Sequence, residues 1–173
     1  MQVSGEYTFD APQELVWNAL QDPGILGSVL PGGQGFEAVS DNEYTGVLSV
    51  KVGPVNGTFN GKITLSDVNP PTSYNIKVEG NGAQGYVQGH GGLTLTPQGD
   101  QTHMVYRGEA QVGGRIASVG QRLIDASAKS IIRQALEGLN AYLKVEVQKQ
   151  ALAEATPTVI VESDSPSAMD DVS

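Results

Sequence analysis

A long apolar stripe near the C-terminus leaves few folds open to this chain. From Gly113 to about Gln150, apolar residues recur at steps of three and four, which predicts one continuous amphipathic helix. At 1.5 Å per residue, about 35 residues make a rod of roughly 50 Å, which needs a wide surface beneath it. The stripe comprises Ile116, Val119, Leu123, Ile124, Ile131, Ile132, Ala135, Leu136, Leu139, Tyr142 and Leu143.

The sequence before this helix has the pattern of β-strands separated by turns. Residues 3–9 alternate between apolar and polar, and turn residues such as Gly53-Pro54 divide a later stretch into six further strands. The short connections between them favour an antiparallel meander. The six strands are predicted at residues 35–41, 43–53, 55–68, 73–82, 85–96 and 102–112.

Two short helices are predicted between the first strand and the meander. Asp10 and Asp22 are suited to cap the N-termini of these helices, and Pro12 suits the first turn. The first helix runs to about Leu20, and the second covers residues 23–30. The sequence therefore predicts an α+β fold, in which a curved antiparallel sheet of about seven strands wraps around the long C-terminal helix.

Glycines are concentrated in two successive predicted strands. A glycine in a strand costs roughly 0.5–1 kcal/mol relative to alanine, so this concentration needs a reason. Glycines allow a sheet to bend, to bulge or to admit another group close to its backbone. They indicate a strongly curved sheet with open space on its concave side, although glycines tolerated in loops are the alternative. The glycines are Gly80, Gly82, Gly85, Gly89, Gly91 and Gly92.

Length and composition indicate one folded domain with a distinct tail. The 173 residues can sustain a single core, and the chain contains no cysteine. No apolar run approaches the length of a membrane span, and the N-terminus lacks the basic and apolar regions of a signal peptide, so we expect a cytoplasmic protein. We expect the domain at residues 1–149 and an acidic, disordered tail at residues 150–173.

The formal net charge of −9 argues against binding to nucleic acid, which requires a basic face. The long predicted helix is the exception. Arg115, Arg122 and Lys129 lie seven residues apart and Arg133 follows four residues later, so they share one face. Such a row is either a solvated face or a contact site for an acidic partner or an anionic surface, including peripheral contact with a membrane.

Few residues are suited to catalysis or to metal binding. His90 and His103 are the only histidines, whereas a metal site needs three or four ligands. The chain has no nucleophile elbow, P-loop or dinucleotide motif, so we predict no catalytic residue, no metal and no cofactor. His90 alternates with Gln88 and Tyr86, which predicts either a polar cluster inside a cavity or a surface group. An enzyme of the cyclase or dehydratase type, using His90 or Glu109, is the alternative to a non-catalytic role.

An apolar cavity forms if the long helix and the curved sheet do not meet completely. Ligand pockets are mostly apolar with few polar groups, so the aromatic and aliphatic residues of this chain are candidates for the lining. The alternative for each of them is ordinary core packing. The candidate ligand-binding residues are Trp17, Leu20, Leu26, Leu30, Phe36, Phe59, Ile63, Tyr86, His90, Val119, Leu123 and Ile124.

Several stretches carry a family resemblance over about residues 1–147. The order of elements, with Val16-Trp17, Asp22-Pro23 and Leu30-Pro31-Gly32, resembles the START-like helix-grip superfamily, also called SRPBCC or polyketide cyclase/Bet v 1-like. Within it, the chain is similar to the CoxG family of carbon monoxide dehydrogenase subunits. The stretches that carry this similarity are Lys51-Val52-Gly53-Pro54-Val55, Phe59-Asn60-Gly61-Lys62-Ile63, Asn69-Pro70-Pro71 and residues 113–122.

This resemblance implies a deep apolar cavity between the long helix and the sheet. It also implies an accessory protein of molybdenum-dependent aerobic CO dehydrogenases and related hydroxylases, which binds the oxidoreductase or recruits it to the membrane. The implied ligand is a hydrophobic small molecule, quinone-like or lipid-like. Some members end in an apolar or amphipathic anchoring segment, whereas the tail of this chain is acidic and polar. A protein-interaction module without a ligand is a further alternative.

Overall fold

The structure, a computed structural model, describes the backbone of residues 1–167 and the side chains of residues 1–154. Each of the seven predicted strands lies within two residues of an observed one, and both short helices are present. The elements are β1 (Gln2–Phe9), α1 (Gln13–Leu20), α2 (Pro23–Val29), β2 (Gly33–Ser40), β3 (Glu43–Val52), β4 (Val55–Asn69), β5 (Ser73–Gly82), β6 (Gly85–Gln98), β7 (Gln101–Gly113), the 3-10 helix η1 (Arg115–Val119) and α3 (Gln121–Ser167).

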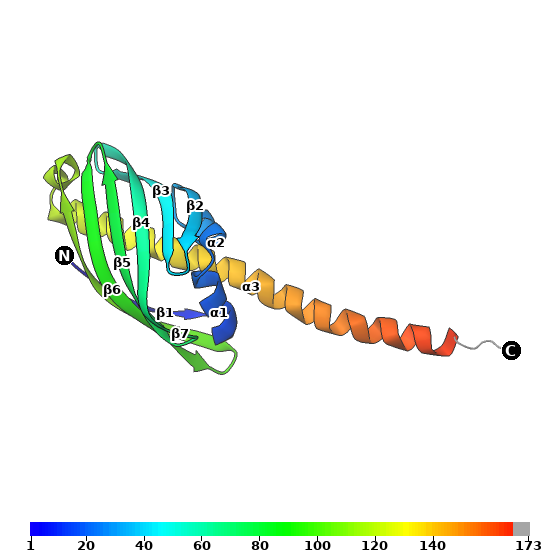
Figure 1. The fold of residues 1–173 in the computed structure, drawn as a ribbon. Helices are drawn as coiled ribbons and strands as arrows, with labels where there is room; N and C mark the ends of the chain where they lie inside the picture. Colours follow the sequence, from blue (N-terminus) through cyan, green and yellow to red (C-terminus); the bar gives the residue numbers. More distant parts are fainter. Residues whose placement is uncertain (168–173) are drawn as a thin grey trace.

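The seven strands form one sheet in the order β1-β7-β6-β5-β4-β3-β2. All neighbouring strands are antiparallel, so β2 to β7 make the predicted meander and β1 closes it beside β7. The sheet curves around α3, which crosses its concave side and projects beyond it (Figure 1). This arrangement confirms the predicted α+β helix-grip fold.

The apolar stripe predicts that the long helix begins at Gly113, but in the structure α3 begins at Gln121. Gly114 and Gly120 have φ angles of 84° and 99°, which glycine adopts without strain, and they bracket η1. Arg115 therefore lies on a separate 3-10 turn and does not share a face of α3 with Arg122 and Lys129. At its other end, α3 continues past the predicted end near Gln150.

The tail prediction concerns the part of the chain where the structure describes least. Residues 151–155 are mostly strong helix formers, which is consistent with the continuation of α3 beyond residue 150. Residues 168–173 lie outside the described residues. The division into a domain at 1–149 and a disordered acidic tail therefore stays a prediction.

The two predicted helix caps have different outcomes. Asp22 caps α2, because its carboxylate accepts hydrogen bonds from the backbone N–H groups of Gly24 (2.9 Å) and Ile25 (3.2 Å). Asp10 does not cap α1, whose N-cap is Pro12. Its carboxylate instead accepts a hydrogen bond from Asn140 of α3, so it fastens the start of the domain to the long helix.

Two clusters of buried side chains hold α3 against the sheet. The smaller cluster, near the start of α3, contains Val52, Phe59, Ile116 and Ile124. The larger cluster, around α1 and the middle of α3, contains Phe9, Ala11, Val16, Trp17, Ala19, Leu20, Tyr44, Leu65, Tyr74, Leu95, Met104, Leu139 and Leu143. The long helix is thus anchored at two separate places along its length.

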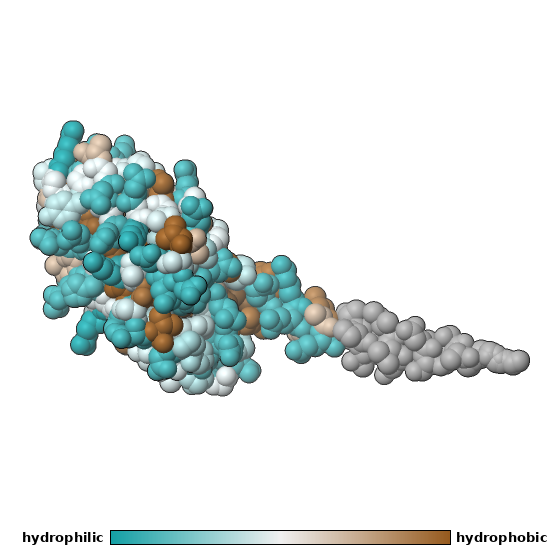
Figure 2. All heavy atoms as spheres, viewed as in Figure 1, coloured by the Kyte–Doolittle hydropathy of each residue, from teal (hydrophilic) through white to brown (hydrophobic). Residues whose placement is uncertain are grey.

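The outer surface is mainly hydrophilic on the face shown in Figure 2, where hydrophobic residues are scattered rather than gathered in one patch. Val145 and Leu152, both on α3, are 49% and 69% exposed. Among the helices of the described residues, none combines the length and the apolar character that crossing a membrane requires.

Candidate ligand-binding cavity

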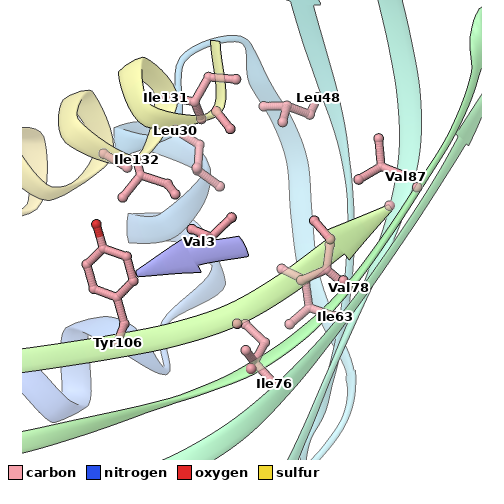
Figure 3. A pocket seen from close by; sticks show the side chains of 18 of the residues that line it. Val3, Leu30, Leu48, Ile63, Ile76, Val78, Val87, Tyr106, Ile131 and Ile132 are labelled. Atoms are coloured by element: carbon pink, nitrogen blue, oxygen red, sulfur yellow. The ribbon is translucent and has the colours of Figure 1, made fainter. Parts of the chain in front are cut away.

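A cavity of about 570 Å³ lies between the concave face of the sheet and α3. This volume is within the range of about 300–1,000 Å³ that is typical of small-molecule sites. Its wall draws on both buried clusters, so the cavity occupies the space between the two places where α3 is anchored. Figure 3 shows side chains from the helices and the strands converging on it, among them Val3, Leu30, Leu48, Ile63, Ile76, Val78, Val87, Ile131 and Ile132.

Glycines keep this space open at positions where the strands face the helix. A Cβ atom on Gly61 would meet no atom closer than 3.6 Å, and the same holds for Gly80. Both glycines line the cavity, so their missing side chains contribute directly to its volume. Gly91 has a different role, because a Cβ atom there would collide with the backbone oxygen of Arg107 on β7. The predicted glycine cluster thus combines open space with close approach of neighbouring strands.

Few polar side-chain atoms face the cavity. The hydroxyl of Tyr44 donates to the backbone carbonyl of Gln21 (3.1 Å) and is therefore satisfied. The hydroxyl of Tyr106 has no hydrogen-bond partner among the described residues, and Figure 3 shows it directed toward the helix side of the cavity. Burial raises the pKa of Tyr106, so this phenol stays protonated at neutral pH and remains a hydrogen-bond donor.

Eight of the twelve candidate residues line the cavity. Seven of them contribute apolar character, and the eighth, His90, contributes its backbone, because its side chain is 73% exposed on the other face of β6. The eight residues are Leu20, Leu26, Leu30, Phe36, Phe59, Ile63, His90 and Ile124. Their role in binding a ligand stays a prediction.

The other four candidates lie outside the cavity wall. Trp17 is buried in the larger cluster, where its ring packs edge-on against Tyr74 with the ring centroids 5.5 Å apart. The ring of Tyr86 lies over Gly113, on the outer face. Val119 is part of η1 and packs against the smaller cluster, whereas Leu123 is 42% exposed on α3. For these residues, placement on the cavity was wrong.

The predicted polar cluster around His90 does not face the cavity. Along β6, Val87, Gly89 and Gly91 face inward, so His90 faces solvent, and so does Gln88. His90 Nε2 lies 4.0 Å from a carboxylate oxygen of Glu109, which is itself 64% exposed. An enzymatic reaction that uses His90 or Glu109 inside the cavity is therefore incompatible with the structure. Among the described residues, no group of three potential ligands is placed to hold a metal ion.

Sequence reasoning missed several lining residues on strands whose alternation points them inward. Leu48, Val50 and Val52 share one face of β3, and this alternation was a usable signal. Tyr106 follows the apolar Val105, so the pattern does not show which of the two faces inward. In the structure, Val105 is 49% exposed and Tyr106 lines the cavity.

The fold and its apolar cavity define a START-like protein of the helix-grip class. The Zhui aromatase/cyclase from Streptomyces sp. R1128 has this fold with a TM-score of 0.64 and 14% identity, over 85% of this chain and 95% of that chain. A START superfamily protein from Mycobacterium smegmatis has it with a TM-score of 0.63 and 13% identity, over 83% of this chain and 97% of the other.

The chain belongs to the family of the carbon monoxide dehydrogenase subunit CoxG, whose model matches residues 5–144. A conserved protein from Geobacillus kaustophilus is similar to this chain, with 29% identity and a TM-score of 0.79, covering 83% of this chain and 95% of that one. No curated protein matches the sequence. Both the superfamily and the family indicated by the sequence motifs are thereby confirmed.

Proposed function

We propose that this protein binds a hydrophobic small molecule in the cavity between α3 and the sheet. The observation that supports this proposal is a space of about 570 Å³ with an almost entirely apolar wall. An apolar ligand that fills this space removes its own surface from water, at roughly 25 cal/mol per Å².

The proposed ligand is quinone-like or lipid-like. An apolar body fits the wall, and the free hydroxyl of Tyr106 supplies a donor for a carbonyl oxygen. A donor that faces an apolar space without a partner favours a ligand that satisfies it, because an unmade hydrogen bond is costly. A quinone has both an apolar ring system and such carbonyl groups.

We further propose that the protein is a cytoplasmic accessory to a CO dehydrogenase or a related molybdenum hydroxylase. Membership of the CoxG family supports this role. Under this proposal, the protein holds its ligand near the oxidoreductase or recruits the oxidoreductase to a surface. The position of His90 and Glu109 on the outer face favours this non-catalytic role over the cyclase or dehydratase alternative.

The test is to identify what the purified protein carries and accepts. We expect native mass spectrometry to show an added mass, and solvent extraction to release a lipophilic molecule. We also expect added naphthoquinone or ubiquinone analogues to raise the midpoint of thermal unfolding. Absence of both an extracted molecule and a thermal shift would contradict the proposal. Co-purification with a co-expressed molybdenum hydroxylase tests the accessory role separately.

A further inference from the structure

A second hollow, which we call the groove, lies beside the cavity between β3 and α3. Its volume is about 320 Å³. Val50, Ser127 and Ile131 line both the groove and the cavity, so the two spaces adjoin at these three side chains. The groove is therefore the candidate route by which a ligand reaches the cavity from solvent.

The groove lies beside the last residues of β3, which extends to Val52, past the first residue of β2. The pairing of β2 with β3 ends at Gly33 opposite Leu48, and the backbone N–H of Ser49 donates to the carbonyl of Gly32 at 3.1 Å. Backbone N–H groups two residues apart point to the same side of a strand, so the N–H of Lys51 points where β2 is no longer present. Lys51 thus lies on an open sheet edge that borders the groove.

The groove offers more polar groups than the cavity, because half of its lining residues are polar: Ser49, Lys51, Ser127, Ser130 and Gln134. Lys51 is exposed and forms no ion pair with any described residue. Ser127 presents a hydroxyl that likewise has no partner within the described side chains. Gln134 Nε2 donates to Ser130 Oγ at 2.9 Å, which leaves the second amide hydrogen of Gln134 free.

The charges around the groove are mainly positive, although the protein as a whole is acidic. Arg122, Lys129 and Arg133 are exposed on the adjoining face of α3, and none is paired with a carboxylate within the described residues. The acid closest along α3, Asp125, accepts a hydrogen bond from Gln121 Nε2 at 2.8 Å. This local reversal of charge attracts an anionic group to the groove.

We infer that the groove is the mouth of the cavity and binds the anionic head of a single-chain amphiphile, a long-chain carboxylate, whose tail lies in the cavity. This inference rests on the proposed ligand binding and adds to it the place and the chemistry of the head. A charged group cannot be buried in the apolar cavity without a partner, so the charge of such a ligand stays in the groove. There the backbone N–H of Lys51 is available to it, and the exposed Lys51 side chain on the same sheet edge adds a positive charge nearby.

The experiment compares oleate with methyl oleate, which has the same chain and no charge. Affinity is measured by displacement of a fluorescent apolar probe from the wild type, Lys51→Glu and Lys77→Glu. Lys77→Glu is the matched control, because it makes the same charge change on the outer face of β5. We expect Lys51→Glu to weaken oleate binding about tenfold and to leave methyl oleate binding unchanged. We expect Lys77→Glu to change neither.

A second variant keeps the test informative if Lys51→Glu does not fold. Gln134→Glu is nearly isosteric and places a negative charge in the groove from the other side, so it should weaken oleate selectively as well. Equal effects of Lys51→Glu on both compounds, or no effect on either, overturn the inference while ligand binding stands. If neither compound binds to the wild type, but quinone analogues do, the inference fails and the proposed function survives. If no apolar compound binds, both fail.

Discussion

The ring of Tyr106 lies across Gly5, its cross-strand neighbour on β1. A Cβ atom on Gly5 would be 2.5 Å from the hydroxyl oxygen of Tyr106 and 2.8 Å from the ring carbon that carries it. The absence of a side chain at Gly5 therefore allows the phenol to lie against β1 and to present its hydroxyl to the cavity. A small residue on an edge strand thus determines where this donor of the apolar wall is placed.

Replacing Tyr106 by phenylalanine should make ligand binding less selective. The change removes the hydroxyl and leaves the ring, so the cavity keeps its shape. We expect the affinity for menadione, a naphthoquinone, to fall about fivefold, which corresponds to about 1 kcal/mol for one hydrogen bond. The affinity for methylnaphthalene, which has no carbonyl, should not change. Titration calorimetry with both compounds measures the difference, and an equal loss for both would contradict the role of the hydroxyl.

Gly5→Ala provides an independent test of the same relationship. The added methyl group would collide with the phenol, so Tyr106 must turn away from β1. We expect menadione binding, measured by the same calorimetry, to weaken in Gly5→Ala to about the same extent as in Tyr106→Phe. In the double variant, the two effects should not add, because both remove the same contact.

Filling the cavity from the sheet side should abolish ligand binding without unfolding the protein. Gly61→Val places a branched side chain in open space, since a Cβ atom there would meet nothing closer than 3.6 Å. Valine also removes the cost of a glycine in a strand, roughly 0.5–1 kcal/mol, so thermal stability should be unchanged or higher. Asn60→Val, on the exposed face of the same strand, is the control. Unchanged binding in Gly61→Val would show that the ligand lies elsewhere.

The strands and the meander were predictable because alternation and turn residues are local signals. Which face of β6 points into the cavity could not be predicted, because Gly89 and Gly91 have no side chains whose hydrophobicity would mark the inward side. His90 was therefore assigned to the cavity, although it faces solvent. The break in the helix at Gly120 was missed for a related reason. Ile116 and Val119 continue the apolar spacing of α3, and this spacing alone does not show that the backbone is interrupted between them and α3. The cavity itself depends on long-range packing, which no local pattern encodes.

The link between Asp10 and Asn140 should make stability depend on acid pH. Asn140 donates to the carboxylate of Asp10 at 3.0 Å and accepts from its backbone N–H at 2.8 Å. Hydrogen bonds from Asn140 and Gln101 lower the pKa of Asp10 below its usual value of 3.8. The folded state thus favours the ionised carboxylate, so this stabilisation is complete above the unfolded pKa and is lost as the pH falls through the folded pKa.

Asn140→Ala tests this link. We expect the variant to unfold at a temperature a few degrees lower than the wild type at pH 7. The difference between the two proteins should shrink as the pH is lowered below about 4, because protonation of Asp10 removes its interaction in the wild type as well. Thermal unfolding followed by circular dichroism from about pH 2 to 7 measures both effects. A difference in midpoint that is constant over this range would contradict the assignment.

The exposed basic residues of α3 should contribute to recognition of an acidic partner. Arg122 and Lys129 lie seven residues apart on the solvent face of α3, and neither is paired with a carboxylate in the described part of the chain. If a molybdenum hydroxylase binds this face, Arg122→Glu combined with Lys129→Glu should reduce its co-purification at least about tenfold, since attraction becomes repulsion. Lys62→Glu combined with Lys77→Glu makes the same charge change on the outer face of the sheet and should have no effect. Binding of an uncharged ligand such as menadione should be retained in the α3 variant, which shows that its cavity is intact. Equal recovery of the hydroxylase with both double variants would exclude this face as the docking site.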